Sequence, residues 1–270
     1  MGSKITRISK ESNDQISLTN QAGKVFKYDH VISTLPLGVL QSVDTSTLNF
    51  DLKKRMAIRS LSYSSSVKII MKFKTRWWQD ANKMNGKPIV GGQTYTDLPI
   101  RKILYPSYGV NCSDASGALL VSYTWAQDAT RLGSRITPKT PSQRDIKKED
   151  ELIKDVLTQL TQIHGEMVRN EYTGQYYAFN WNDNQYSMGA FSFYGPGEFK
   201  TLYRSMIKAE ADGRVHFAGE ATSVHHGWIE GALNSGYRSV MEILMKENKY
   251  LELENLKLDW GLVDELSFYN

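Results

Sequence analysis

The segment from Arg214 to Lys246 constrains the fold of this chain more than any other stretch of its sequence. Arg214 to Glu220 has the pattern of an apolar strand that ends in Gly-Glu, and a loop then leads to Gly227. Apolar residues next recur at helical spacing, which predicts a helix from about Trp228 to Lys246. The residues of this apolar stripe are Ile229, Leu233, Gly236, Val240 and Leu244.

The start of this predicted helix is suited to a polar ligand. A strand that feeds a helix N-terminus presents the Glu220 carboxylate, which accepts hydrogen bonds, together with backbone N–H groups at the positive end of the helix dipole. One side of the helix also stays small, so a flat group or another backbone can approach closely. The small residues are Gly227, Gly231, Ala232, Ser235 and Gly236.

The N-terminal part of the chain has the pattern of β structure. Strands are predicted over 4–9, 15–19 and 25–34, with a turn at 20–23. Because two or three strands are marginal on their own in water, we expect them to join a larger sheet.

The middle of the chain mixes both patterns. A strand-like run from Leu61 to Phe73 is interrupted by Lys68, residues 77–117 are rich in loop formers, and Ala118 to Trp125 is predicted as a buried strand. Residues 148–164 have a helical pattern that ends before Gly165, a plausible C-terminal cap. The apolar face of this helix consists of Leu152, Ile153, Val156, Leu157, Leu160 and Ile163. The tail 251–270 has no readable pattern.

Composition excludes several classes of protein. With 40% hydrophobic and 23% charged residues, the chain is globular, and a net charge of +4 with dispersed charges does not favour nucleic acid or an anionic membrane as partner. No apolar run approaches the ~20 residues of a transmembrane helix. The single cysteine, Cys112, excludes internal disulfides and lies in a glycosylation-type triplet, Asn111-Cys112-Ser113. The adjacent histidines at 225–226 lack the spacing of a metal site, so no metal is predicted.

Four motifs resemble the flavin amine oxidase family. Val215 to Gly236 resembles its C-terminal FAD signature, Tyr28 to Leu40 its second FAD-domain strand, and Ser64 to Phe73 the strand that carries its flavin-site lysine. Thr96-Asp-Leu-Pro-Ile-Arg101 is similar to the L-amino-acid oxidase branch. In order and spacing, the resemblance spans roughly Lys4 to Leu244.

The chain departs from the family in one respect, because no three glycines have the Gly-x-Gly-x-x-Gly spacing that holds the FAD pyrophosphate. The chain therefore resembles the C-terminal half of an oxidase, a fragment that would need an N-terminal half or a complementing chain. The fold expected is mixed, α/β and α+β: part of a Rossmann-like FAD domain in two segments, 1–50 and 201–250, with a mixed-sheet substrate domain inserted at 51–200 and a tail at 251–270.

The resemblance implies roles for individual residues. Lys68 would be catalytic, holding a water against flavin N5, and Tyr123 would bind the substrate carboxylate. Gly227, Trp228, Trp181 and Phe191 would line the substrate pocket. The residues implied to contact FAD are Ile5, Gly219, Glu220, Gly227, Trp228, Ile229, Glu230, Gly231 and Ala232. Six of these residues also have a purely structural interpretation. Ile5, Tyr123, Trp181 and Phe191 can be core residues, and Lys68 and Glu220 can be solvent-facing positions.

The function implied is FAD-dependent oxidation of an L-amino acid by oxygen to the 2-oxo acid, ammonia and hydrogen peroxide, with a homodimer compatible with the full enzyme. Two alternatives stay open: a polyamine or monoamine oxidase, whose substrates lack a carboxylate, and a non-catalytic remnant that binds no FAD. The sequence indicates neither the amino acid nor the compartment.

Overall fold

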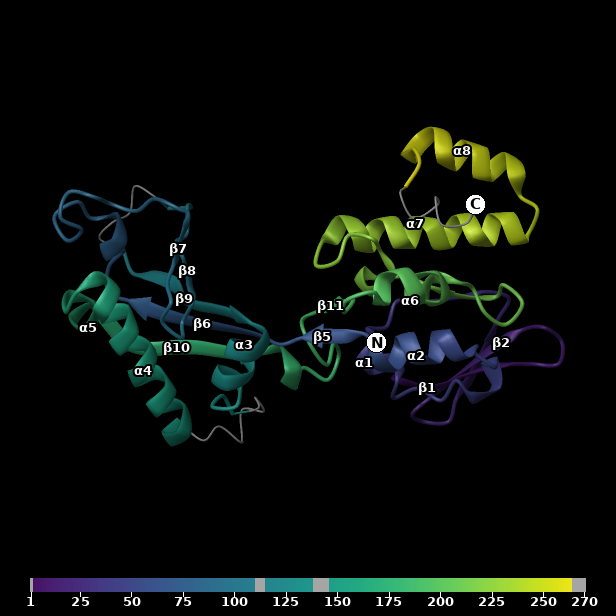
Figure 1. Cartoon of the computed structure of the whole chain (residues 1–270), viewed down its shortest axis with the longest axis horizontal. Coiled ribbons are helices and arrows are strands. Elements are labelled where there is room, and N and C mark those ends of the chain that lie inside the picture. Colours follow the sequence, from purple (N-terminus) through teal and green to yellow (C-terminus); the bar gives the residue numbers. More distant parts are fainter. Residues whose placement is uncertain (1, 110–114, 138–145, 264–270) are drawn as a thin grey trace. The chain divides into compact units, whose positions relative to one another are not determined.

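The computed structural model describes residues 2–109, 115–137 and 146–263, which form two compact units. Unit 1 contains residues 1–64 and 185–270, and unit 2 contains residues 65–184. The Asn111-Cys112-Ser113 triplet lies outside the described residues, as does the end of the tail from 264. Figure 1 shows helices and sheets in both units, so the mixed α/β fold class is confirmed.

Unit 2 is built on a five-stranded antiparallel sheet with the strand order β10-β6-β9-β8-β7. Its strands are β6 (Ser66–Phe73), β7 (Gln93–Tyr95), β8 (Lys102–Leu104), β9 (Gly117–Trp125) and β10 (Tyr172–Asn180). Its helices are α3 (Ala126–Gly133), α4 (Ile146–His164) and α5 (Met167–Glu171), with 3₁₀ turns η2 (Trp77–Gln79) and η3 (Trp181–Asp183). The helix predicted at 148–164 is thus confirmed, and Gly165 follows it at a φ of +90°.

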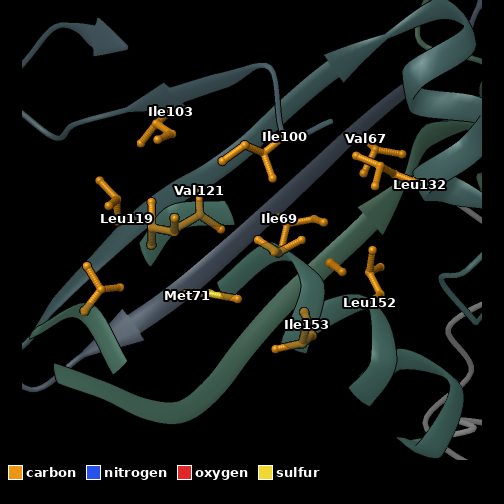
Figure 2. Close-up of a cluster of buried hydrophobic side chains, with 14 of the residues drawn as sticks. Val67, Ile69, Met71, Ile100, Ile103, Leu119, Val121, Leu132, Leu152 and Ile153 are labelled. Carbon is orange, nitrogen blue, oxygen red and sulfur yellow. The ribbon is translucent and has the colours of Figure 1, made fainter. Parts of the chain in front are cut away.

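The core of unit 2 lies between one face of the sheet and the helices. Side chains alternate across a strand, so β6 turns Val67, Ile69 and Met71 to this core, where they meet Leu152 and Ile153 of α4 (Figure 2). Lys68 lies on the opposite face. The prediction of β9 as a buried strand therefore holds for one face only, because Val121 is fully buried whereas Trp125 is 40% exposed.

The described residues of unit 1 form three small sheets. Strands β1 (Ile5–Lys10), β2 (Ile16–Asn20) and β3 (Val25–Tyr28) form an antiparallel sheet, and β5 (Ser62–Ser64) pairs with β11 (Phe191–Phe193). Strand β4 (Val31–Ser33) pairs in parallel with β12 (Val215–Phe217). The predicted single strand over 25–34 is wrong. The chain leaves one sheet after Tyr28 and enters another at Val31, and no local pattern marks that exchange.

The helices of unit 1 are α1 (Leu37–Leu40), α2 (Leu52–Ser60), α6 (Glu198–Ile207), α7 (Ile229–Lys246) and α8 (Tyr250–Trp260), with 3₁₀ turns η1 (Ser46–Leu48) and η4 (Glu220–Thr222). Helix α8 occupies part of the tail that had no readable pattern, and Figure 1 shows it beside α7, where the Tyr237 hydroxyl donates to the Gly261 carbonyl at 2.7 Å. None of the described helices has the length and apolar character needed to cross a bilayer.

Helix α7 buries its polar side. Its apolar stripe is largely exposed, with Ile229 at 81% and Leu233 at 69%, whereas Arg238 and Ser239 are fully buried. The physical reason is that α7 covers the ends of other elements, whose carbonyls need donors. Arg238 supplies them, because it donates to the carbonyl oxygen of Ile207 at 3.1 Å and also to that of Phe217.

Candidate active site

A cavity of about 180 Å³ lies in unit 1 where the two parallel strands β4 and β12 end. Residues 33–37, after β4, form one wall, and residues 217–222, after β12, form the other. The carboxyl ends of parallel strands are the usual ligand position in open α/β sheets. Tyr63 also lines the cavity, and burial raises the pKa of its hydroxyl to about 12, so the group stays neutral.

Glu220 organises the chain beside this cavity. Its carboxylate accepts hydrogen bonds from the Gly227 backbone N–H at 2.8 Å and from the Ser192 backbone N–H at 3.1 Å. His226 Nδ1 lies 3.4 Å from the same carboxylate. Burial pushes the pKa of Glu220 upward, but the hydrogen bonds from His226, Ser192 and Gly227 outweigh it and hold the pKa below its ordinary value. Glu220 is therefore an ionised group that ties β11 to the loop before α7.

Within the described residues, no side chain caps the N-terminus of α7. Trp228 occupies the N-cap position without a capping side chain, and the first turn is open to solvent on the side of Ile229. The opposite side of this turn is closed, because a Cβ on Gly231 would stand 2.3 Å from the His225 carbonyl oxygen. The close backbone approach expected of the small residues is thus made by the chain's own loop. Phe191 lies nearby, 4.0 Å from where a Cβ on Gly227 would stand.

Lys68 and Tyr123 come together in unit 2. They face each other across β6 and β9 in the register of the sheet, and the Lys68 Nζ is 5.0 Å from the centroid of the Tyr123 ring. Both are partly exposed on the face of the sheet that is opposite the core. We call this surface the aromatic face, and it carries Lys68, Lys102, Tyr95, Tyr123, Trp125 and Phe179.

Trp181 borders the aromatic face. Its ring packs edge-on against Phe179 with centroids 5.0 Å apart, and Phe179 is the register partner of Lys68 on β10. The residues singled out from the sequence are thus brought together in two groups, with Lys68, Tyr123 and Trp181 in unit 2. The second group, in unit 1, is Phe191, Gly219, Glu220 and 227–232.

Ile5 belongs to the β1-β2-β3 sheet of unit 1, where it pairs with Asn20 and packs, partly buried, against the core of that unit. Its implied adenine contact stays a prediction.

Lys102 is a charged residue of the aromatic face that was not singled out from the sequence, and neither were Tyr95, Trp125 and Phe179. Its Nζ lies 4.3 Å from the centroid of a Trp125 ring and 5.5 Å from that of Tyr123. The signal that could have found it is the alternation of β8, since Ile103 points into the core and its neighbour must therefore point to the other face.

Comparison with known proteins identifies the family. The chain matches the profile of the flavin containing amine oxidoreductases over residues 1–244. It is 40% identical to L-amino-acid oxidase 4 of Hebeloma cylindrosporum, over 96% of this chain and 43% of that protein. The chain belongs to the flavin-containing amine oxidoreductase family. A provisionally named bifunctional amine oxidase of Dictyostelium discoideum is 45% identical, over 97% of this chain and 24% of its own length.

This member of the amine oxidoreductase family spans less than half the length of these relatives. Solved structures agree in fold: an engineered putrescine oxidase superposes with a TM-score of 0.69 at 12% identity, over 90% of this chain and 48% of that one. A cyclohexylamine oxidase from Brevibacterium oxydans gives a TM-score of 0.67 at 13% identity, over 91% of this chain and 48% of that one.

The family match supports FAD as the cofactor, as the resemblance predicted. The cavity in unit 1 fits part of such a molecule. Ser33 and Ser187 line it, and their buried hydroxyls have no hydrogen-bonding partner among the described residues. Gly219, with a φ of +118°, lets the backbone turn inward at the end of β12. At about 180 Å³, the cavity is smaller than the roughly 300–1,000 Å³ of a complete small-molecule site, so it has room for only part of such a ligand.

Proposed function

We propose that the complete enzyme to which this chain belongs is an FAD-dependent L-amino-acid oxidase. The net reaction converts an L-amino acid, oxygen and water to the 2-oxo acid, ammonia and hydrogen peroxide. The observation that carries the proposal is the Lys68–Tyr123 pair, a cation and a phenol that face each other on the aromatic face of unit 2. L-Amino-acid oxidases among the relatives, at 40% and 36% identity, support the substrate class.

Bound FAD would supply the two-electron acceptor. Tyr123 would bind the substrate, because a phenol hydroxyl donates a hydrogen bond to a carboxylate and its ring excludes water from one side of the ligand. Lys68 would hold a water molecule beside the reacting carbon. Its ammonium group can donate three hydrogen bonds, and it makes none within the described residues.

In unit 1, the N-terminus of α7 would stabilise negative charge on the cofactor, because unpaired N–H groups and the helix dipole both favour an anion there. Glu220 would position that N-terminus through its hydrogen bonds to Gly227 and Ser192. Trp228, 69% exposed beside that N-terminus, would contact the cofactor.

Two variants test these roles in the complete enzyme, assembled from this chain and the N-terminal part of the FAD domain. We expect Tyr123→Phe to raise KM for amino acids about 10-fold or more, because a hydrogen bond to a charged group is worth roughly 1.5–3 kcal/mol. Lys68→Met should lower the rate of flavin reduction or of flavin reoxidation, measured by stopped-flow absorbance. Unchanged amino-acid kinetics in both variants would contradict the proposal.

The second candidate is an oxidase of simple amines, favoured by the similarity of fold to putrescine and cyclohexylamine oxidases. An amine has no carboxylate for Tyr123 to bind. If the enzyme releases peroxide from putrescine or cyclohexylamine but not from amino acids, and if Tyr123→Phe is silent, the amine oxidase assignment replaces ours. A protein that retains no flavin after incubation with FAD and desalting, with its N-terminal part present, would be a non-catalytic remnant.

A further inference from the structure

Lys102 is unusually buried for a lysine. Only 9% of the residue is exposed, and its Nζ lies among three rings, 4.3 Å from the centroid of Trp125, 5.1 Å from that of Tyr95 and 5.5 Å from that of Tyr123. A buried ammonium group is normally paired with a carboxylate, because ring faces replace only part of its lost hydration.

Two other lysines, Lys54 and Lys83, follow that rule. Lys54 is fully buried and lies 3.4 Å from a carboxylate oxygen of Glu210, and Lys83 lies 2.7 Å from one of Glu171. Lys102 has no such carboxylate among the residues that the structure describes. Its neighbour Arg101 is already engaged, with its Nε 2.7 Å from Asp128. The aromatic face therefore holds a cation without its anion.

Access to this cation is preserved. Within the described residues, the Lys102 Nζ is not one of the buried polar atoms that lack a hydrogen-bond partner, and the rings beside it are themselves open to solvent, Tyr95 at 66% and Trp125 at 40%. The turn before β8 fixes its position: Arg101 adopts a φ of +57°, and its backbone N–H donates to the Leu98 carbonyl at 2.9 Å.

The order of side chains across the sheet suggests which anion fits. Lys68 on β6, Tyr123 on β9 and Lys102 on β8 stand on three successive strands, which are spaced about 4.8 Å apart. If the α-carboxylate of the substrate binds at Tyr123 on β9, Lys102 on β8 lies one strand away from that carboxylate, on the side opposite Lys68. The two carboxylates of aspartate or glutamate are three or four C–C bonds apart, about 4–5 Å, which is close to one strand spacing.

We propose that Lys102 binds the side-chain carboxylate of an acidic L-amino acid, so that the substrate class of the enzyme is dicarboxylic. This proposal rests on the proposed function for the position of the α-carboxylate. We infer the ligand from charge complementarity. A buried, unpaired ammonium group is stabilised most by an anion, and the CH₂ groups of an acidic amino acid can pack against the surrounding rings.

The first experiment measures binding to the 270-residue chain and needs no flavin. The probes are glutarate and its neutral analogue glutaramide, titrated by two-dimensional NMR or tryptophan fluorescence. We expect glutarate to bind more tightly than glutaramide, and Lys102→Met to weaken glutarate binding roughly 10- to 100-fold while glutaramide is unaffected. Lys102→Arg, which keeps the charge, should retain most of the affinity.

Lys72→Met is the matched control. Lys72 is an exposed lysine on the same strand and the same face as Lys68, four residues or about 13 Å farther along β6. This variant should bind glutarate like the unaltered chain. Equal affinity for glutarate and glutaramide, or a loss in Lys72→Met as large as in Lys102→Met, would overturn the proposal.

The second experiment uses the complete, flavin-loaded enzyme and compares L-glutamate with L-glutamine and L-aspartate with L-asparagine. Lys102→Met should shift the ratio of kcat/KM from acid toward amide roughly 10- to 100-fold. If the variant instead lowers kcat/KM equally for all amino acids, the cation serves the α-carboxylate and the side-chain assignment is wrong. If no amino acid is oxidised, the proposed function fails, while the glutarate titration still decides the role of Lys102.

Discussion

At the scale of single residues, two glycines of α7 have opposite surroundings. Gly231 is pressed against the loop before the helix: a Cβ there would stand 2.3 Å from the His225 carbonyl oxygen and 2.5 Å from the Ser223 Oγ. Gly236, five positions later in the same helix, has open space at its Cβ position within the described part of the chain. The requirement for glycine therefore differs between them although the local conformation is the same.

We expect Gly231→Ala to destabilise the chain by about 1–3 kcal/mol, because backbone atoms must move to admit the methyl group. Gly236→Ala should instead stabilise it by up to about 1 kcal/mol, since alanine has the higher helix propensity. Urea unfolding of the two variants and the unaltered chain measures both differences. Similar effects of the two substitutions would show that the loop at 223–225 does not hold its position against α7.

At the scale of elements, the end of α4 gives the chain a pH dependence. His164 is enclosed next to Trp77, with ring centroids 5.0 Å apart, and its Nε2 is 2.7 Å from the Tyr105 hydroxyl. Burial lowers the pKa of His164 from its ordinary 6.5 to about 4. Between pH 6.5 and pH 4, His164 is protonated in the unfolded chain but neutral in the folded chain. This residue therefore lowers the free energy of unfolding as the pH falls from 6.5 to 4.

His164→Gln removes this titration. Its free energy of unfolding should fall less between pH 7 and pH 4.5 than that of the unaltered chain, by on the order of 2 kcal/mol once partial solvent exposure is allowed for. Urea unfolding at the two pH values measures the difference, and the comparison cancels the carboxylates that titrate in the same range. Parallel loss of stability in both proteins would contradict the assignment of His164 as a buried neutral group.

The helices also show which features of the fold could be predicted from the sequence. The helix at 148–164 was predictable because its apolar face and its burial coincide. For α7 the pattern correctly predicted a helix but not its buried side, since Arg238 and Ser239 are fully buried while Leu233 is 69% exposed. Polar burial on α7 depends on carbonyl groups of Ile207 and Phe217, which are distant in sequence, so no local rule reveals it.

The candidate site shows the same division. Glu220 and the glycines beside it could be proposed from the sequence, because they belong to one continuous segment that resembles the C-terminal FAD signature of the family. The alternation of β8 could have placed Lys102 on the face opposite the core, but its surroundings could not be predicted, because the rings of Trp125 and Tyr123 belong to another strand. The exchange of sheets between Tyr28 and Val31 was missed for a similar reason, as β4 is specified by its distant partner β12.

At the scale of the whole molecule, the chain contains two separate hydrophobic cores. Among the described residues, every member of one core lies in unit 2, between Val67 and Ala178, and every member of the other lies in unit 1. Units with their own cores behave as domains that can unfold independently.

We therefore expect thermal unfolding, followed by calorimetry, to show two transitions or a calorimetric enthalpy that exceeds the van't Hoff enthalpy. Ile69→Ala, in the fully buried centre of unit 2, should lower the free energy of unfolding of unit 2 by about 2–5 kcal/mol. Met206→Ala should destabilise only unit 1. Trp77 and Trp78 are buried in unit 2, so tryptophan fluorescence identifies its transition. A single transition that both substitutions shift equally would mean that the two cores form one cooperative unit. Independent shifts would instead mean that the aromatic face, with Lys68, Lys102 and Tyr123, belongs to a unit whose stability does not depend on unit 1 and its cavity.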